Sequence, residues 1–271
     1  AQAGACGFVR ALRLEHAALR THSAHICCPV VSMPPLPALT TPTAEAEVLW
    51  CGTECFVARL CACHMTATMC PTLAHGTCAI TGGLGGLGLR AAVMVIEGGA
   101  RVVLSSRSGR TSTPALPASG SAAINSMVCD VSDATEARIL PALTPYAGVL
   151  HAAGVLHDKM IRSMALEYVR VSFAPKALAA SHLQALVVCT PLEALGLFSS
   201  IASTFGSIGQ ANYAAANAHL DALARCRREQ GVLGSSLQIP AVSGAGMGAT
   251  TFATEQLDAM GAASLDEFAS W

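Results

Sequence analysis

The sequence predicts an α/β protein with a doubly wound parallel sheet, in which helices cover both faces of one sheet. The first observation is a regular alternation of short apolar runs and helical segments from Thr77 onward. The second is a glycine-rich turn, from Gly82 to Gly88, that joins the first apolar run to an alanine-rich segment. The third is composition: 52% of the residues are hydrophobic and 12% are charged, which allows a sizeable core. Strands that alternate with helices are typical of parallel sheets.

The expected elements follow one another at short intervals. Strands are expected at residues 78–81, 101–106, 124–129, 147–151, 195–199 and 236–242. Helices are expected at 89–96, after a capping box of Asp133 and Glu136, at 168–188 with a break at Pro175, and at 210–230, ended by Gly231. Residues 108–121 are rich in Ser, Thr, Pro and Gly, so a loop is expected there in place of a helix.

Residues 1–75 differ from the rest and are expected to form a partial structural subdomain and linker ahead of a catalytic domain of residues 76–271. Residues 7–19 look like the edge of a strand or helix, and residues 29–42 form a connector with five prolines. Residues 45–60 suggest one or two short strands. The chain begins at Ala1 without methionine, so we expect a fragment of a cytoplasmic protein, with organellar targeting left open.

Charge and hydropathy argue against two classes of partner. The net charge is −1 and there is no run of Lys or Arg, which argues against nucleic acid. No stretch reaches about 18 uninterrupted apolar residues, so no membrane span is expected. Twelve cysteines raise the question of a metal, and the best zinc candidate is Cys61, Cys63, His64 and Cys70. Its C-x-C-H spacing lacks the usual loop between paired ligands, so reduced thiols that fill space are favoured.

The glycine-rich turn predicts a phosphate-binding site. It fits G-x-G-x-x-G from Gly83 to Gly88 and T-G-x-x-x-G-x-G from Thr81 to Gly88. Glycines let the backbone approach a ligand closely, and a helix N-terminus offers N–H groups to a phosphate. The candidate cofactor-binding residues of this turn are Thr81, Gly82, Gly83, Gly85, Gly86, Leu87 and Gly88.

The end of the second strand favours NADP(H) over NAD(H). An NAD site usually has an acidic residue about 20 positions after the glycines. Here the strand ends in Ser106 and Arg107, and an arginine would pair with a 2′-phosphate. A solvated surface arginine is the alternative. Asp130, which closes the third strand, either hydrogen-bonds the adenine edge or only forms part of a turn.

A second set of residues suggests proton transfer to a carbonyl oxygen. Ser200 lies at the carboxyl end of a predicted strand, and Tyr213 and Asn217 share one helix face. A tyrosine can donate a proton to a developing alkoxide, but its free pKa of about 10 is high. A nearby ammonium would lower that pKa, and Lys176, one of two lysines in the chain, is the candidate. The alternative is that Tyr213 is a half-buried core residue.

Residues from about 77 to 247 resemble the ketoreductase domain of modular polyketide synthases, a branch of the short-chain dehydrogenase/reductase superfamily with a Rossmann-like sheet. The matching motifs occur in order over about 170 residues, at 81–88, 104–108, 128–131, 149–155, 174–176, 198–203 and 209–217. Residues 7–60 also resemble the end of the structural subdomain that precedes such reductases, truncated at its start.

The resemblance implies that NADPH reduces the β-keto group of a thioester on an acyl carrier protein to a 3-hydroxyacyl thioester, beside neighbouring domains of a polyketide or fatty-acid synthase. Tyr213 would donate the proton and Ser200 would hydrogen-bond the carbonyl oxygen. Lys176 would lower the tyrosine pKa and hold the nicotinamide ribose, and Asn217 would position Lys176 or a relay water. The resemblance also adds cofactor-lining residues at Val131, Ala152, Ala153 and Gly154.

Three segments bear on stereochemistry and on departures from the family. Leu156-His157-Asp158 resembles the Leu-Asp-Asp motif of B-type ketoreductases, and Phe205 stands at the position of the A-type tryptophan, so a D-configured product is favoured. Gln238-Ile239-Pro240 replaces the usual Asn-Trp-Gly at the nicotinamide end. Met247 precedes an expected lid at residues 248–265.

Two alternative functions stay open. One is a stand-alone reductase of a small free carbonyl compound, against which the Lys176/Asn217 arrangement and the N-terminal subdomain argue. The other is a catalytically impaired structural module of a synthase. The presence of the tyrosine, the serine and the glycines argues against it, whereas the unusual segments at 108–121 and 239–240 favour it.

Overall fold

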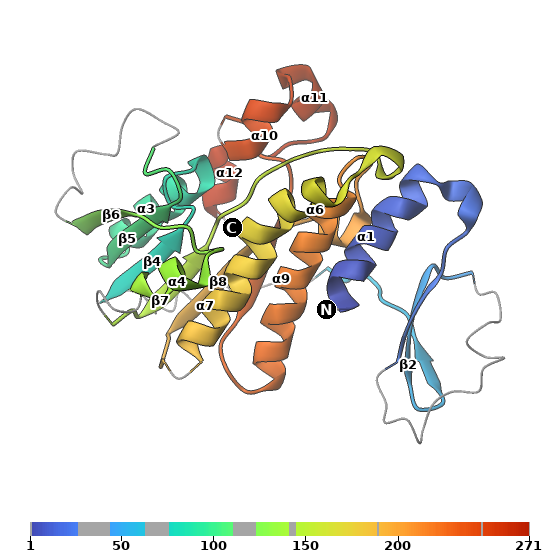
Figure 1. Cartoon of the computed structure of the whole chain (residues 1–271), viewed down its shortest axis with the longest axis horizontal. Coiled ribbons are helices and arrows are strands. Elements are labelled where there is room, and N and C mark those ends of the chain that lie inside the picture. Colours follow the sequence, from blue (N-terminus) through green and yellow to red (C-terminus); the bar gives the residue numbers. More distant parts are fainter. Residues whose placement is uncertain are drawn as a thin grey trace.

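A computed structural model of the chain describes residues 2–26, 44–62, 76–110, 123–140, 145–188, 190–244 and 246–270. Its centre is a six-stranded sheet in the order β6-β5-β4-β7-β8-β9, and every pairing in it is parallel (Figure 1). The strands are β4 (Thr77–Thr81), β5 (Arg101–Ser106), β6 (Ile124–Val128), β7 (Gly148–His151), β8 (Ala194–Ser200) and β9 (Ser235–Ile239).

The strand order confirms the predicted doubly wound fold. The chain starts at β4 in the middle of the sheet, moves outward through β5 and β6, and then crosses to β7 on the other side. Between β4 and β7 the direction of winding reverses. In such sheets a ligand binds beyond the carboxyl ends of the strands at this reversal.

Helices cover both faces of the sheet because side chains along each strand alternate between the faces. Cys78 and Ile80 of β4 belong to one apolar cluster, together with Leu89 of α3. Ala79 between them belongs to the opposite cluster, which includes Leu220 of α9. The helices of this part are α3 (Gly86–Glu97), α4 (Ala134–Ala137), α6 (Leu166–Phe173), α7 (Ala179–Val187), α8 (Ala202–Phe205) and α9 (Ala211–Glu229), with a 3-10 turn at Ile161–Ser163.

Two helix predictions need correction. Pro175 does not interrupt the helix. Instead, α6 continues into α7 through a π-helical turn, Ala174–Leu178, which accommodates a residue that has no N–H. Asp133 caps α4, since its Oδ1 accepts from the backbone N–H of Thr135 and of Glu136. The capping box is not reciprocal, however, because the Glu136 carboxylate accepts from the N–H of Asp130, 2.7 Å away, and α4 is a single turn.

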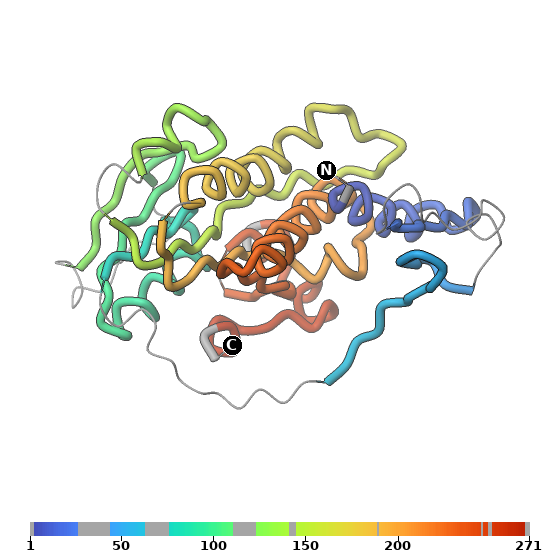
Figure 2. Tube along the Cα trace, turned by 90° about the horizontal axis from the view of Figure 1, so that it is seen from below, coloured from blue at the N-terminus to red at the C-terminus, as the bar shows by residue number. Residues whose placement is uncertain are grey.

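The N-terminal unit, residues 2–26 and 44–62, lies beside the large sheet. It contains α1 (Gln2–Glu15), a 3-10 turn (Ala17–Leu19) and a three-stranded sheet of β1 (Ser23–Ile26), β2 (Glu47–Cys51) and β3 (Glu54–Phe56). β1 is parallel to β2, and β3 is antiparallel to it. The small sheet stands apart from the large one, whereas α1 lies along α9 (Figures 1 and 2).

The ambiguous segment at 7–19 is therefore mainly helical, the two strands expected within 45–60 are confirmed, and β1 was not anticipated. The proline-rich connector and the expected boundary after residue 75 lie largely or wholly outside the described residues. The same holds for three members of the zinc candidate, while its fourth, Cys61, is exposed.

The C-terminal part is more helical than expected. Residues 248–265 were expected to form a lid, and this region contains two short helices, α10 (Gly246–Thr251) and α11 (Thr254–Ala259), before α12 (Leu265–Ser270). β9 ends at Ile239, earlier than predicted, because Pro240 has no N–H to continue the ladder. Most of the 108–121 loop is outside the described residues. Among the described helices, none is both long and apolar enough to cross a membrane.

Candidate active site

A cavity of about 710 Å³ opens at the carboxyl ends of β4, β5, β6 and β7. The glycine turn, the π-helical turn and the beginning of α10 complete its wall. All but one of the predicted cofactor-binding residues line it, namely Thr81, Gly82, Gly85, Gly86, Leu87, Gly88, Ser106, Arg107, Asp130, Val131, Ala152, Ala153 and Gly154. The exception is Gly83.

The glycine turn is shaped by close backbone contacts. Gly82 has φ +68°, and a Cβ there would stand 2.6 Å from the Ala153 nitrogen at the end of β7. Gly83 packs against the sheet: its N–H donates to Ser105, and a Cβ would stand 2.6 Å from the Ile80 oxygen. Gly88 lets α3 rest on the turn, since a Cβ would meet the Gly82 oxygen at 2.5 Å. The first N–H groups of α3 have no partner within the helix and are available to a phosphate.

Two arginines lie at the rim of the cavity beyond β5. Arg107 was predicted, and Arg110 was missed because it falls in the segment interpreted as a loop. Both are exposed, and neither makes an ion pair with another residue that the structure describes. In the sequence, Arg110 could have been found from its position three residues after Arg107, just beyond the same strand. Two guanidinium groups at one site suit a phosphate monoester.

Asp130 forms part of a turn and also faces the cavity. Its Oδ1 accepts from the N–H of Ser132 at 3.0 Å and from the Ser132 hydroxyl at 2.6 Å, so the carboxylate closes a turn. The residue also lines the cavity. The turn therefore fixes the Asp130 carboxylate at the wall of the cavity, and a contact with an adenine edge stays a prediction.

The four predicted catalytic residues come together from three elements. Lys176 lies in the π-helical turn and is only 2% exposed. Its Nζ donates to the Phe198 carbonyl at 2.8 Å and lies 5.3 Å from the centre of the Tyr213 ring. Ser200 ends β8, and Tyr213 lies in the first turn of α9, one turn before Asn217. All four side chains are buried.

Burial controls the protonation of Tyr213. Desolvation raises the pKa of its hydroxyl, and hydrogen bonding with the side chains of Asn217 and Ser200 opposes that rise only in part. Tyr213 is thus protonated at neutral pH. The net direction is opposite to the lowering expected from Lys176. Burial also lowers the pKa of Lys176, to about 7, so the lysine can lose its proton close to neutral pH.

Asn217 holds one buried atom that has no protein partner among the described residues. Its Nδ2 donates to the Tyr213 carbonyl at 2.8 Å, but its Oδ1 accepts nothing. A buried acceptor of this kind is where a water or a protonated amine is expected to donate.

His151 was not among the residues predicted for the site. It is fully buried at the end of β7, with Nδ1 2.6 Å from the Thr81 hydroxyl and Nε2 2.9 Å from the Lys176 carbonyl. Because a carbonyl only accepts, Nε2 carries the hydrogen and Thr81 donates to Nδ1. Burial, with a smaller effect of the charge of Lys176, lowers the pKa of His151 to about 4. In the sequence, His151 could have been found because it is a histidine at the end of an apolar strand.

The segments tied to stereochemistry, to the nicotinamide end and to the lid make different contacts. Asp158 accepts from the Gln210 side chain at 2.8 Å, and the His157 ring meets Tyr168 edge-on. Met247, which precedes the expected lid, lines the cavity. Gln238 does not: its side chain donates to Asp221 and accepts from Thr204.

Comparison with known proteins identifies close relatives. A family model described as "KR domain" matches residues 76–244. Polyketide synthase GfsA of Streptomyces halstedii is 44% identical over 174 residues, which are 60% of this chain and 2% of that protein. The pikromycin polyketide synthase component PikAIII of Streptomyces venezuelae is 40% identical over 185 residues, or 64% of this chain and 12% of that protein. The chain therefore spans a small part of these relatives.

Two solved structures superpose on nearly the whole of this chain. An A-type ketoreductase from a modular polyketide synthase superposes with a TM-score of 0.83 at 29% identity, over 98% of this chain and 60% of the other. A ketoreductase from the first module of phoslactomycin biosynthesis in Streptomyces sp. HK803 gives 0.81 at 29% identity, over 99% of this chain and 66% of the other. The superposed share includes the N-terminal unit.

Proposed function

Since the chain belongs to the ketoreductase domain family of polyketide synthases, within the short-chain dehydrogenase/reductase superfamily, we propose that it reduces the β-keto group of an acyl thioester with NADPH. The observation that carries this proposal is the meeting of Lys176, Ser200, Tyr213 and Asn217 beside a cavity lined by a glycine turn. A core tyrosine would not need a buried lysine beside it, since burying an amine costs stability.

The residues present fit NADPH along the whole cavity. Arg107 and Arg110 suit the 2′-phosphate, and the beginning of α3 suits the pyrophosphate. At the other end, Gly154 allows a close approach by Lys176, since a Cβ there would stand 2.8 Å from its Cε. When bound, the cofactor supplies a hydride to the carbonyl carbon.

The side chains supply the proton and the hydrogen bonds. Tyr213, held protonated by burial, donates its proton to the substrate oxygen as negative charge develops there. Ser200 donates a hydrogen bond to the same oxygen. Lys176, with a pKa of about 7, can return a proton to Tyr213 at neutral pH, through a water held at Asn217 Oδ1.

The proposed substrate is a β-ketoacyl chain on the phosphopantetheine of an acyl carrier protein. Support comes from the relatives, which are polyketide synthases of which this chain matches 2–12% in the two cases above. Neighbouring synthase domains are proposed as partners for the same reason. The segment Leu156–Asp158 favours a D-configured 3-hydroxyacyl product.

One assay tests the proposal. NADPH oxidation is followed with a β-ketoacyl thioester, for the unmodified chain and for Tyr213→Phe. We expect turnover that prefers NADPH to NADH, and a loss of roughly a thousandfold in Tyr213→Phe because the proton donor is gone. NADPH binding, measured by fluorescence, is expected to be the same in both proteins.

Two outcomes would contradict the proposal. Turnover of free ketones but not of thioesters would favour a stand-alone reductase. NADPH binding without any turnover would favour a structural module.

A further inference from the structure

Helix α1 of the N-terminal unit is seated directly on the backbone of the catalytic helix α9. At Gly7 a Cβ would stand 2.3 Å from the Ala214 oxygen and 2.9 Å from the Ala218 Cβ. Ala11, one turn later, is fully buried. Ala214 follows Tyr213, so α1 touches the turn that carries the proposed proton donor.

Glu15 ends this helix in a position where a negative charge is unfavourable. The C-terminus of a helix carries partial negative charge, which repels a carboxylate. The Glu15 carboxylate is directed away from its own helix to two peptide N–H groups of other segments. Its Oε2 accepts from Ile161 at 2.7 Å, and its Oε1 accepts from Gly209 at 2.9 Å. Both oxygens are thus used by the catalytic part of the chain.

These two N–H groups belong to segments that meet beside Tyr213. Lys159 donates from its backbone to the Gly209 carbonyl at 2.7 Å, and the Gln210 side chain donates to Asp158. Gln210 precedes the first residue of α9, and Tyr213 is in the first turn of that helix. Glu15 therefore clamps the segment that follows Leu156–Asp158 to the beginning of α9.

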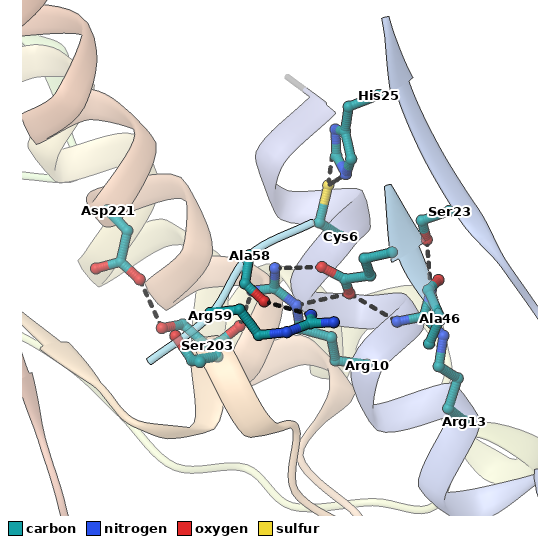
Figure 3. A network of polar contacts seen from close by, with 12 residues as sticks. Cys6, Arg10, Arg13, Ser23, His25, Ala46, Ala58, Arg59, Ser203 and Asp221 are labelled. Atoms are coloured by element: carbon teal, nitrogen blue, oxygen red, sulfur yellow. Dashed lines mark hydrogen bonds and ion pairs between the residues drawn. The ribbon is translucent and has the colours of Figure 1, made fainter. Parts of the chain in front are cut away.

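A second residue of α1 reaches α8, the short helix that follows Ser200. Arg10 donates to the Ser203 carbonyl while Glu47 of β2 pairs with its guanidinium (Figure 3). The Ser203 hydroxyl lies 2.7 Å from the Ser200 carbonyl and 2.5 Å from the Asp221 carboxylate. The clamp at Glu15 is thus one of two places where α1 holds a segment next to a predicted catalytic residue.

We propose that Glu15 is a positioning residue for substrate binding: its carboxylate sets the distance between the Leu156–Asp158 segment and the first turn of α9. The cavity that suits NADPH contains no residue of α1, so the effect is confined to the substrate side. The effect on catalysis rests on the proposed function, whereas the clamp itself does not.

Glu15→Gln tests the clamp without removing volume. A glutamine has one acceptor oxygen, and its NH₂ would face the second peptide N–H. Amide exchange at Ile161 or Gly209 is expected to become about tenfold faster, the effect of losing a hydrogen bond to a charged group. The KM for a β-ketoacyl thioester is expected to rise about tenfold, more than kcat falls, with lower stereochemical purity of the product and an unchanged Kd for NADPH.

Glu54→Gln is the matched control, because it makes the same change at an exposed residue of β3 in the same unit. It is expected to alter none of these quantities. Amide exchange needs no turnover, so the clamp can be judged even if the chain reduces no thioester. Unchanged exchange at both amides in Glu15→Gln would overturn the proposal, and so would an equal rise of KM in the control.

Ile161→Pro provides a second, independent test by deleting one of the two N–H groups. Met160 before it has φ −58° and ψ 140°, which a following proline accepts, and residue 161 begins a helical turn. When Glu15→Gln is added to this variant, the new amide side chain faces only the Gly209 N–H, which its single oxygen can satisfy. The combined variant is therefore expected to show no further loss beyond that of Ile161→Pro. Additive losses would show that the two residues act separately.

Discussion

At the scale of one residue, Lys176 lowers the stability of the folded chain and at the same time provides a group that can transfer a proton near neutral pH. Its amine is almost fully buried, and one carbonyl, that of Phe198, is the acceptor found for it. Burial lowers its pKa to about 7 from 10.5. The folded state thus releases this proton far more easily than the unfolded state, so folding with the lysine charged is unfavourable. Such a cost is expected where a proton must move near neutral pH.

Lys176→Met is therefore expected to abolish turnover and to raise the free energy of unfolding. The expected gain is roughly 3 kcal/mol near pH 6, less than the full pKa shift implies because the hydrogen bond to Phe198 is lost. Between pH 7 and 10.5 the unfolded state keeps a proton that the folded state has released. The stability of the unmodified chain therefore rises with pH in this window, and the advantage of the variant shrinks.

Urea unfolding at pH 6 and pH 9 measures both effects. A variant that is less stable than the parent at pH 6 would contradict the assignment of Lys176 as a strained, functional residue. A gap that does not narrow by pH 9 would contradict the low pKa.

At the scale of elements, the sequence predicted the strands and helix ends that depend on residues close together in the chain. β5 was predicted to the residue because the apolar run Val102–Leu104 lies at its centre, and Gly231 marked the end of α9. β1 was not predicted, because it is held by pairing with β2, whose register joins Ser23 to Glu47 across a long connection. The same limit applies to the site: the glycine turn was visible, whereas the clamp at Glu15 depends on a contact between residues far apart in the sequence.

His151 joins three elements of the site, since it ends β7 and bonds both Thr81 of β4 and the π-helical turn at Lys176. Its folded-state pKa of about 4 lies below the ordinary value of 6.5. As pH falls from 6.5 towards 4, the unfolded state gains a proton and the folded state does not. We expect the chain to lose on the order of 3 kcal/mol of stability over this range through His151.

His151→Gln removes the titrating group and keeps one acceptor and one donor. Its stability is expected to change less than that of the parent between about pH 6.5 and about pH 4.5, measured by urea unfolding. Parallel loss in the two proteins would assign the acid sensitivity to other groups.

The whole molecule consists of a dinucleotide-binding sheet and an N-terminal unit that reaches its substrate side through one helix. In the described part of the chain, the residues that line the cavity all fall between 81 and 247, whereas Glu15 and Arg10 hold segments next to Tyr213 and Ser200 from outside. We therefore expect changes in α1 to affect substrate use and stability, and to leave cofactor binding intact. The two glycines of α1 that face α9 allow a test of this separation.

Gly7→Ala and Gly4→Ala make the same change on the same face of α1, but the spaces differ. A Cβ at position 7 would stand 2.3 Å from the Ala214 oxygen, and one at position 4 would stand 3.4 Å from the Ala215 oxygen. Alanine favours a helix over glycine by about 1 kcal/mol, so Gly4→Ala is expected to be neutral or slightly stabilising.

Gly7→Ala must push α1 off α9, at a cost of roughly 1–3 kcal/mol. Because that movement withdraws Glu15 and Arg10 from their partners, Gly7→Ala is expected to raise the KM for the thioester at an unchanged Kd for NADPH. Thermal unfolding, NADPH fluorescence and steady-state kinetics on both variants measure this, and equal behaviour of the two would mean that the close contact at Gly7 does not seat the helix.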